Sequence, residues 1–235
     1  MNKELIYLNN LENNNKKFNN NINNKDVFKK LNIYCIDVLL HYLNSSKFPS
    51  AIFPEEFKKL SINKSVFVTW LNLNSNDYRR RLRGCIGSFY PDDLEKQLYN
   101  YTLVSALNDN RFEKVNNIKE LLGFEMSVSL LKEFKSLDND IYNWELGKEG
   151  VYLSFTKNNK DYNSCYLPEV PIIDNWDKKL TLNRCIKKSG YTSDLNLLDE
   201  LQSIIKVDVF KSNKSSITIK EYINIKGYNI EDFYN

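Results

Sequence analysis

A cysteine that follows two alternating arginines, in the segment Arg81-Leu-Arg-Gly-Cys-Ile-Gly87, is the first residue of the sequence that could do chemistry. If this segment is a strand, Cys85 shares a face with Arg81 and Arg83. Neighbouring guanidinium groups favour the thiolate, the form of cysteine that attacks or binds as a ligand. We therefore expect a nucleophilic or ligand-binding thiol, with a small buried packing residue as the alternative. The single histidine, His41, lies far away in the sequence and is not expected to act as its base.

Other polar residues are spaced so that they could share one cleft with this cysteine. Ser127 and Ser129 alternate with apolar residues, whereas Ser105 and Asp109 lie one helical turn apart. We predict a catalytic role for Cys85 and Glu169. The predicted ligand-binding residues are Arg83, Gly84, Gly87, Ser105, Asp109, Arg111, Ser127 and Ser129. The alternatives are an ion pair or cap for Asp109 and Arg111, sheet hydrogen bonding for the serines, and a solvated or capping role for Glu169.

The elements that must position these residues are read from apolar periodicity and turn signals. Helices are expected from Asp26, which can act as the cap, to about Tyr42, and over residues 91–107, 118–122, 179–189 and from 220 onward. Strands are expected at 65–71, 79–87, 124–131, 151–155, 162–167, 204–210 and 216–219. Several strands follow one another without long helices between them, which favours an α+β fold with a mainly antiparallel sheet and flanking helices. The two halves have similar element content, which hints at an internal duplication.

Composition narrows the classes of function. The 235 residues include 33 Lys and Arg against 30 Asp and Glu, and residues 1–30 hold the whole excess. The neutral remainder argues against a dedicated nucleic-acid-binding domain. The four cysteines are dispersed without a C-x-x-C spacing, so we expect reduced intracellular thiols and neither a metal site nor a disulfide framework. No cofactor is indicated.

The N-terminal segment differs from the rest of the chain. Residues 9–24 contain ten Asn, and so few apolar side chains cannot offset the entropy of ordering. We interpret residues 1–25 as a disordered tail, 26–230 as one domain and 231–235 as the C-terminal end. Neither a signal peptide nor a run of about 20 apolar residues is present, so we expect no membrane partner and an intracellular protein, cytoplasmic or nuclear.

The hexapeptide Leu82-Arg-Gly-Cys-Ile-Gly87 resembles the hallmark of the AMMECR family, named after a chromosomal region linked to Alport syndrome, intellectual disability, midface hypoplasia and elliptocytosis. Further segments resemble the family in order and spacing over about residues 30–225. They are 34–39, 67–70, 101–103, 105–112, 127–131, 144–150, 166–170 and 176–177. The likeness is to the eukaryotic, single-domain members.

This resemblance implies an α+β domain with an antiparallel sheet and a larger and a smaller lobe. It implies an intracellular, often nuclear protein of unsettled biochemical function, with a Memo-like or radical-SAM protein as a partner suggested by the fusions and neighbours of microbial members. Two positions depart from the family. Glu149 stands where members often have histidine, which excludes a Cys–His pair there, and Ser189-Gly190 replaces a common Gly-Gly pair.

Three functions remain open. The first is an enzyme or small-molecule-binding protein, in which Arg83 stabilises a thiolate at Cys85 or an anionic ligand and Glu169 or Asp109 accepts a proton. The second is a non-catalytic module that binds a protein partner. Nucleic-acid binding through Arg79–Arg83 is the weakest, because strand alternation divides these arginines between two faces.

Overall fold

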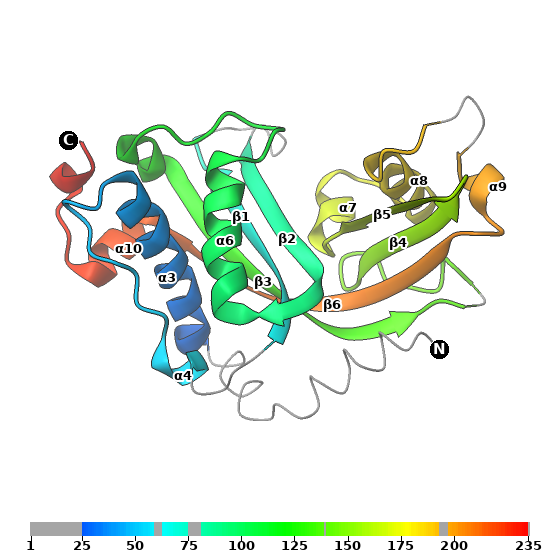
Figure 1. Cartoon of the computed structure of the whole chain (residues 1–235), viewed down its shortest axis with the longest axis horizontal. Helices are drawn as coiled ribbons and strands as arrows, with labels where there is room; N and C mark the ends of the chain where they lie inside the picture. The colour runs from blue at the N-terminus through cyan, green and yellow to red at the C-terminus, as the bar shows by residue number, and fades with distance from the viewer. Residues whose placement is uncertain (1–24, 59–62, 75–80, 139, 193–196, 235) are drawn as a thin grey trace. The chain divides into compact units, whose positions relative to one another are not determined.

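The computed structural model of the chain describes residues 25–58, 63–74, 81–138, 140–192 and 197–234 (Figure 1). The Asn-rich tail, Arg79 and Arg80 therefore lie outside the described residues. Six strands form one sheet in the order β2-β1-β3-β6-β4-β5, with antiparallel pairing and flanking helices. This arrangement confirms the predicted α+β class.

The chain divides into two compact units, which we describe separately. Unit 1 comprises Leu131–Ser212, and unit 2 comprises the described residues before Leu131 and from Asn213 onward. Two long strands, β3 (Phe124–Ser136) and β6 (Lys206–Thr218), contribute residues to both units. Unit 2 is therefore assembled from two separate stretches of sequence.

Unit 2 places two long helices, α3 and α6, on one face of strands β1, β2 and β3 (Figure 1). Its remaining elements are short helices. The bounds are α3 Lys25–Leu43, α4 Glu55–Lys58, β1 Asn63–Asn72, β2 Leu82–Asp93, α6 Leu94–Leu107, η1 Ile118–Gly123, α10 Ile219–Lys226 and η2 Ile230–Phe233. Alternate residues of β1 and β3 enter the core under the helices, namely Val66, Val68, Trp70, Met126, Val128 and Leu130. The opposite face of these strands is therefore the one that carries the intervening residues.

Unit 1 has a second apolar core, in which helix α8 packs on β4 and β5. Its bounds are β4 Gly150–Lys157, β5 Lys160–Tyr166, α7 Glu169–Ile173, α8 Lys178–Lys188 and α9 Leu197–Leu201. Leu153, Leu182 and Cys185 are fully buried in this core. No helix among the described residues is long and apolar enough to span a membrane.

Element boundaries differ from the sequence-based expectations at several places, among them β3, which extends to Ser136. Helix α3 begins at Lys25, so Asp26 lies in its first turn instead of capping it. Strand β2 continues to Asp93, whose side chain accepts a hydrogen bond from the Lys96 amide at 2.8 Å and so caps α6. The predicted strands at 204–210 and 216–219 are one continuous strand, β6, because backbone pairing does not require apolar side chains in its middle.

Candidate functional site

The two faces of β2 separate the glycine and the cysteine of the hexapeptide. Gly84 pairs with Trp70 and faces the helices, whereas Cys85 pairs with Thr69 and faces the other side. A Cβ atom on Gly84 would lie 1.7 Å from the carbonyl oxygen of Ser105, so the missing side chain allows α6 to contact the strand. The Ser105 hydroxyl donates to the Thr102 carbonyl at 3.2 Å. Gly84 and Ser105 therefore lie together on the helix side, and not with the Cys85 side chain.

A threonine from the neighbouring strand contacts the thiol. Thr69 Oγ1 donates a hydrogen bond to Cys85 Sγ at 3.2 Å, and the two residues are direct cross-strand partners. Cys85 is partly exposed, whereas Thr69 is buried. Sequence reasoning missed Thr69, although its place two residues after Phe67 put it on the face opposite Val68 and Trp70. The strand register that brings it to Cys85 is not visible in a single sequence.

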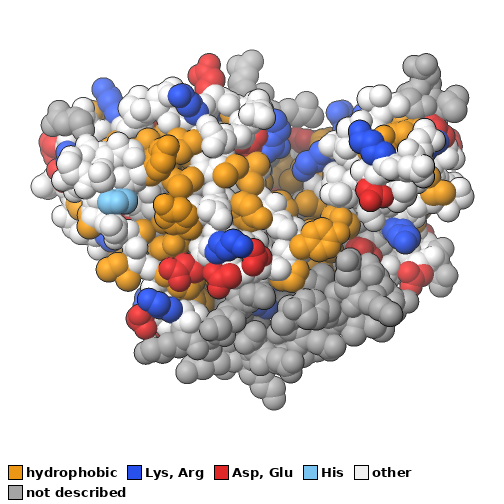
Figure 2. Space-filling model, in the orientation of Figure 1, with side chains coloured by type: hydrophobic (Ala, Val, Ile, Leu, Met, Phe, Trp, Pro, Cys, Tyr) orange, Lys and Arg blue, Asp and Glu red, His pale blue; other side chains and the backbone are white. Residues whose placement is uncertain are grey.

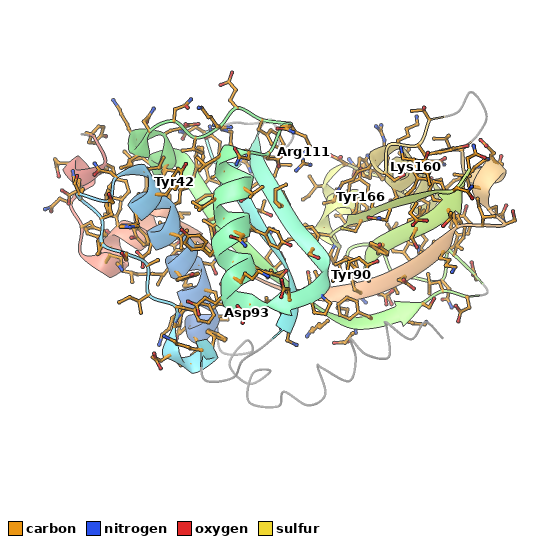
Figure 3. The ribbon with its side chains drawn as sticks, viewed as in Figure 1. Tyr42, Tyr90, Asp93, Arg111, Lys160 and Tyr166 are labelled. Atoms are coloured by element: carbon orange, nitrogen blue, oxygen red, sulfur yellow. The ribbon has the colours of Figure 1, made fainter. Side chains whose placement is uncertain are left out.

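Asp109 and Arg111 hold the backbone of Cys85 at the outer edge of the sheet. Asp109 Oδ2 accepts the Cys85 amide at 3.0 Å, and Arg111 Nη2 donates to the Cys85 carbonyl at 2.8 Å. Arg111 Nη2 and Nε also bond the Asp109 carboxylate at 2.6 and 2.8 Å. Arg111 follows α6, at the end of the helix opposite to Asp93 (Figure 3). The pair therefore fixes the Cys85 peptide through both its N–H and its C=O groups.

The ionisation of Asp109 follows from these contacts. Burial alone would raise its pKa, but hydrogen bonds from the Arg111 side chain and the Cys85 amide, with the charge of Arg111, hold the pKa below its usual value. The predicted ion-pair alternative is thus what the geometry shows. A carboxylate with a lowered pKa and both oxygens engaged is poorly suited to accept a proton near neutral pH, which argues against the proton-accepting role expected for Asp109.

Arg83 does not lie beside the thiol as strict alternation predicts. The β1–β2 register shifts between Trp70 and Leu71, so that Leu71 pairs with Leu82 and Arg83 has no partner across the strand. Its guanidinium bonds the Glu120 carboxylate and the Glu113 carbonyl, and lies 5.6 Å from the Phe124 ring centroid. This irregularity turns Arg83 toward the helix side, so it does not supply positive charge next to Cys85.

Two serines complete the face that carries Cys85. Thr69 is the cross-strand partner of Ser127 on β3 as well as of Cys85 on β2, and Phe67 is likewise opposite Ser129 and Gly87. Both serines are 1% exposed, and neither hydroxyl has a hydrogen-bond partner. Other side-chain atoms of the described residues are also buried without a hydrogen-bond partner, and they belong to other residues. We call Cys85, Thr69, Ser127 and Ser129 the Cys85 site.

Gly87 has a packing role on the same face. A Cβ atom on Gly87 would lie 2.4 Å from the Phe67 ring and 2.3 Å from the Val66 carbonyl oxygen. The missing side chain therefore lets the aromatic ring lie against β2, where it forms an apolar floor beside Ser129.

The second predicted catalytic residue belongs to the other unit. Glu169 begins α7 of unit 1, whereas the four residues of the Cys85 site belong to unit 2. Among the described residues, no group of three or more His, Cys, Asp or Glu side chains is arranged to hold a metal ion. The chemistry that the Cys85 site itself offers is therefore that of one thiol and three hydroxyl groups.

Comparisons with known proteins agree with this fold. A family model described as AMMECR1 matches residues 33–215. An uncharacterised protein of Arabidopsis thaliana is 31% identical over 83% of this chain and 87% of its own length. One of Schizosaccharomyces pombe, also uncharacterised, is 31% identical over 81% and 93%. The crystal structure of an uncharacterised protein from Pyrococcus horikoshii superposes with a TM-score of 0.63 at 23% identity, covering 80% of this chain and 90% of that one.

Proposed function

Because this chain belongs to the AMMECR1 family and its matched relatives are uncharacterised, we propose a function from the site itself: unit 2 binds a small polar molecule at the Cys85 site. The molecule reaches the partly exposed Cys85 thiol first, and the buried Ser127 and Ser129 hydroxyls form the inner part of the site. The Cys85 thiol lies at one end of the site and the Ser129 hydroxyl at the other.

The observation that carries this proposal is the pair of unpartnered hydroxyls on Ser127 and Ser129. A buried polar group without a partner destabilises a protein by about 1–3 kcal/mol. Native proteins satisfy nearly all such groups with protein, water or a ligand. Two unsatisfied hydroxyls at alternate positions of one strand, beside a thiol already contacted by Thr69, are readily explained by a ligand that accepts or donates hydrogen bonds there.

The rigidity of the surrounding backbone also supports a binding role. The Cys85 peptide is fixed by Asp109 and Arg111, and its side chain by Thr69. Groups held in this way lose little conformational freedom when a ligand binds, which favours affinity.

Stability measurements on serine variants test the proposal without knowledge of the ligand. We expect Ser127→Ala and Ser129→Ala to raise the stability of the ligand-free protein by about 1 kcal/mol each, because each removes an unsatisfied hydroxyl. Ser65→Ala is the matched control, since Ser65 is a buried β1 serine whose hydroxyl donates to the Phe89 carbonyl at 2.5 Å. This control should lose stability. If the two test variants lose as much as the control, the hydroxyls serve the fold and the proposal is wrong.

Alkylation by iodoacetamide tests whether a small molecule reaches the thiol. Cys85 is partly exposed, whereas Cys35 and Cys185 are buried and burial raises the pKa of each of these two thiols to about 12. In a time course followed by peptide mass spectrometry, Cys85 should react well before the two buried thiols. Protection of Cys85 for as long as Cys35 would contradict a binding role.

A protein-interaction module is the second candidate, and one observation favours it. Figure 2 shows hydrophobic side chains gathered on the face of unit 2 that carries α3 and α6. Two exposed residues of these helices are Tyr42 of α3 at 62% and Tyr99 of α6 at 48%. If this face binds a Memo-like or radical-SAM protein, Tyr42→Ser with Tyr99→Ser should abolish co-purification of the two proteins and leave Cys85 alkylation unchanged.

A further inference from the structure

The charged groups that bond the Cys85 peptide are paired with each other. Asp109 is paired with Arg111, whereas Arg83 is turned away from the thiol and paired with Glu120. The Asp109 side chain is only 4% exposed, so its charge is committed to this pair. A charged ligand buried on the row of hydroxyls would therefore find no opposite charge, and burial of an unpaired charge is strongly unfavourable.

One carboxylate lies at the margin of the site. Glu125 precedes Ser127 by two residues on β3, which places it on the same face of the sheet, and it is partly exposed. Its negative charge disfavours anions such as phosphates and carboxylates. Because the Glu125 carboxylate remains in contact with water, it offsets little of the free-energy cost of burying a cation.

The backbone fixes the spacing of the hydrogen-bonding groups. Ser127 and Ser129 are separated by two residues of one strand, which corresponds to about 6.8 Å. Cys85 lies two strands away from Ser127, with Thr69 between them, which corresponds to about 9.5 Å. The Phe67 ring, placed opposite Ser129, adds an apolar surface beside these groups.

From these observations we infer that the ligand of the Cys85 site is an uncharged molecule with at least two hydrogen-bonding groups about 7 Å apart and an apolar part beside Phe67. Molecules with hydroxyl or amide groups meet this description, whereas nucleotides, phosphates and carboxylic acids do not. This inference rests on the proposed function, since it names the class of molecule that the same site binds.

Three symmetrical disulfides that differ mainly in charge provide the test. They are 2-hydroxyethyl disulfide, which is neutral, cystamine, which is cationic, and 3,3′-dithiodipropionic acid, which is anionic. In each reaction the Cys85 thiolate attacks one sulfur, a mixed disulfide forms, the reagent S–S bond breaks, and the released thiolate takes up the proton. Equilibrium occupancy of Cys85 is measured by peptide mass spectrometry for the folded protein, and for the same cysteine in urea-unfolded protein as the reference.

We expect the ratio of folded to unfolded occupancy to be about three- to tenfold higher for the hydroxyethyl reagent than for either charged reagent. This is the factor that the free energy of one net hydrogen bond corresponds to. Ser127→Ala should remove most of this preference and leave the charged reagents unchanged. Glu125→Gln is the matched control for the marginal charge, and should raise occupancy by the anionic reagent alone.

The outcomes separate the inference from the proposed function. Equal occupancy by the three reagents, or a preference for a charged one, would overturn the inference while the site remains open to small molecules. If no reagent modifies Cys85 in the folded protein and all three modify it after unfolding, both the inference and the proposed binding site are refuted. A hydroxyethyl preference that survives Ser127→Ala would also overturn the inference, because the preference would then not come from this hydroxyl.

Discussion

The close approach of α6 to β2 at Gly84 gives the sharpest prediction about the hexapeptide. In Gly84→Ala, the new methyl group would lie 1.7 Å from the Ser105 carbonyl oxygen and 2.7 Å from its carbonyl carbon. These are backbone atoms of the helix, so no change of side-chain rotamer can relieve the contact. The helix must therefore move away by about 1.5 Å to restore an ordinary contact distance.

The magnitude follows from two opposing effects. Overpacking of this kind destabilises by about 1–3 kcal/mol, whereas replacing a glycine restricts the unfolded chain and recovers about 0.4–1 kcal/mol. Because the clash is with backbone atoms, the overpacking cost should lie near the upper end of its range, and the expected net loss is about 2 kcal/mol. With a urea dependence of about 2 kcal/mol per molar, the unfolding midpoint falls by about 1 M. Because Asp109 follows α6 directly, the same displacement should also loosen its hydrogen bond to the Cys85 amide.

Urea unfolding followed by circular dichroism measures this loss, with Gly227→Ala as the matched control. Gly227 has a φ of +69° and nothing within 4 Å of an added Cβ atom, so its replacement introduces backbone strain without a clash. The strain should destabilise by about 1 kcal/mol. If Gly84→Ala destabilises less than Gly227→Ala, the close helix–strand contact is not a feature of the folded protein.

Two further predictions concern ionisable groups. Asp109→Asn should destabilise by about 1–2 kcal/mol at pH 7, less than a fully buried pair because Arg111 is 49% exposed. Since the folded pKa of Asp109 is lowered, its contribution is fully present above its unfolded pKa of about 3.9 and is lost as the pH falls through the folded pKa. The difference between the urea midpoints of wild type and variant should therefore shrink progressively as the pH falls below about 3.9, and an unchanged difference would contradict the ion-pair origin. Burial raises the pKa values of the Cys35 and Cys185 thiols to about 12, so the unfolded chain loses these protons first and stability should decline as the pH rises above about 8.5. The double variant Cys35→Ala with Cys185→Ala should flatten this decline between pH 8 and 10.5. If the decline is equally steep in the variant, its cause lies elsewhere.

Strand patterning predicted the faces of the central sheet well. Alternation placed Cys85 and Gly84 on opposite faces and grouped Ser127 with Ser129, and the pairing confirms both. The α+β class followed from the succession of strands. These properties depend on local sequence periods, which one chain is enough to reveal.

The parts that sequence could not predict depend on pairing between distant segments. The irregularity at Arg83 arises from the register of β1 against β2, and it moves the guanidinium from the thiol to Glu120. Thr69 reaches Cys85 through the same register. The polar residues 211–215 hid the continuity of β6, since that strand is held by backbone pairing there and not by an apolar face.

The two-part construction of unit 2 bears on how the protein is synthesised. Asn32 of α3 donates hydrogen bonds to the carbonyls of Met126 and Ser215, and Tyr222 of α10 donates to Asp37 at 2.6 Å. The ribosome therefore completes every residue of unit 1 before it supplies the end of β6 and helix α10, which unit 2 needs. Among the described residues, the unit that begins first is finished last. Its α3 can pack on α6 and β3 early, but its last hydrogen-bond partners lie more than 180 residues downstream. Premature termination anywhere before β6 would release a chain whose first helix has no complete core to enter, a product that cellular quality control recognises by its exposed apolar surface.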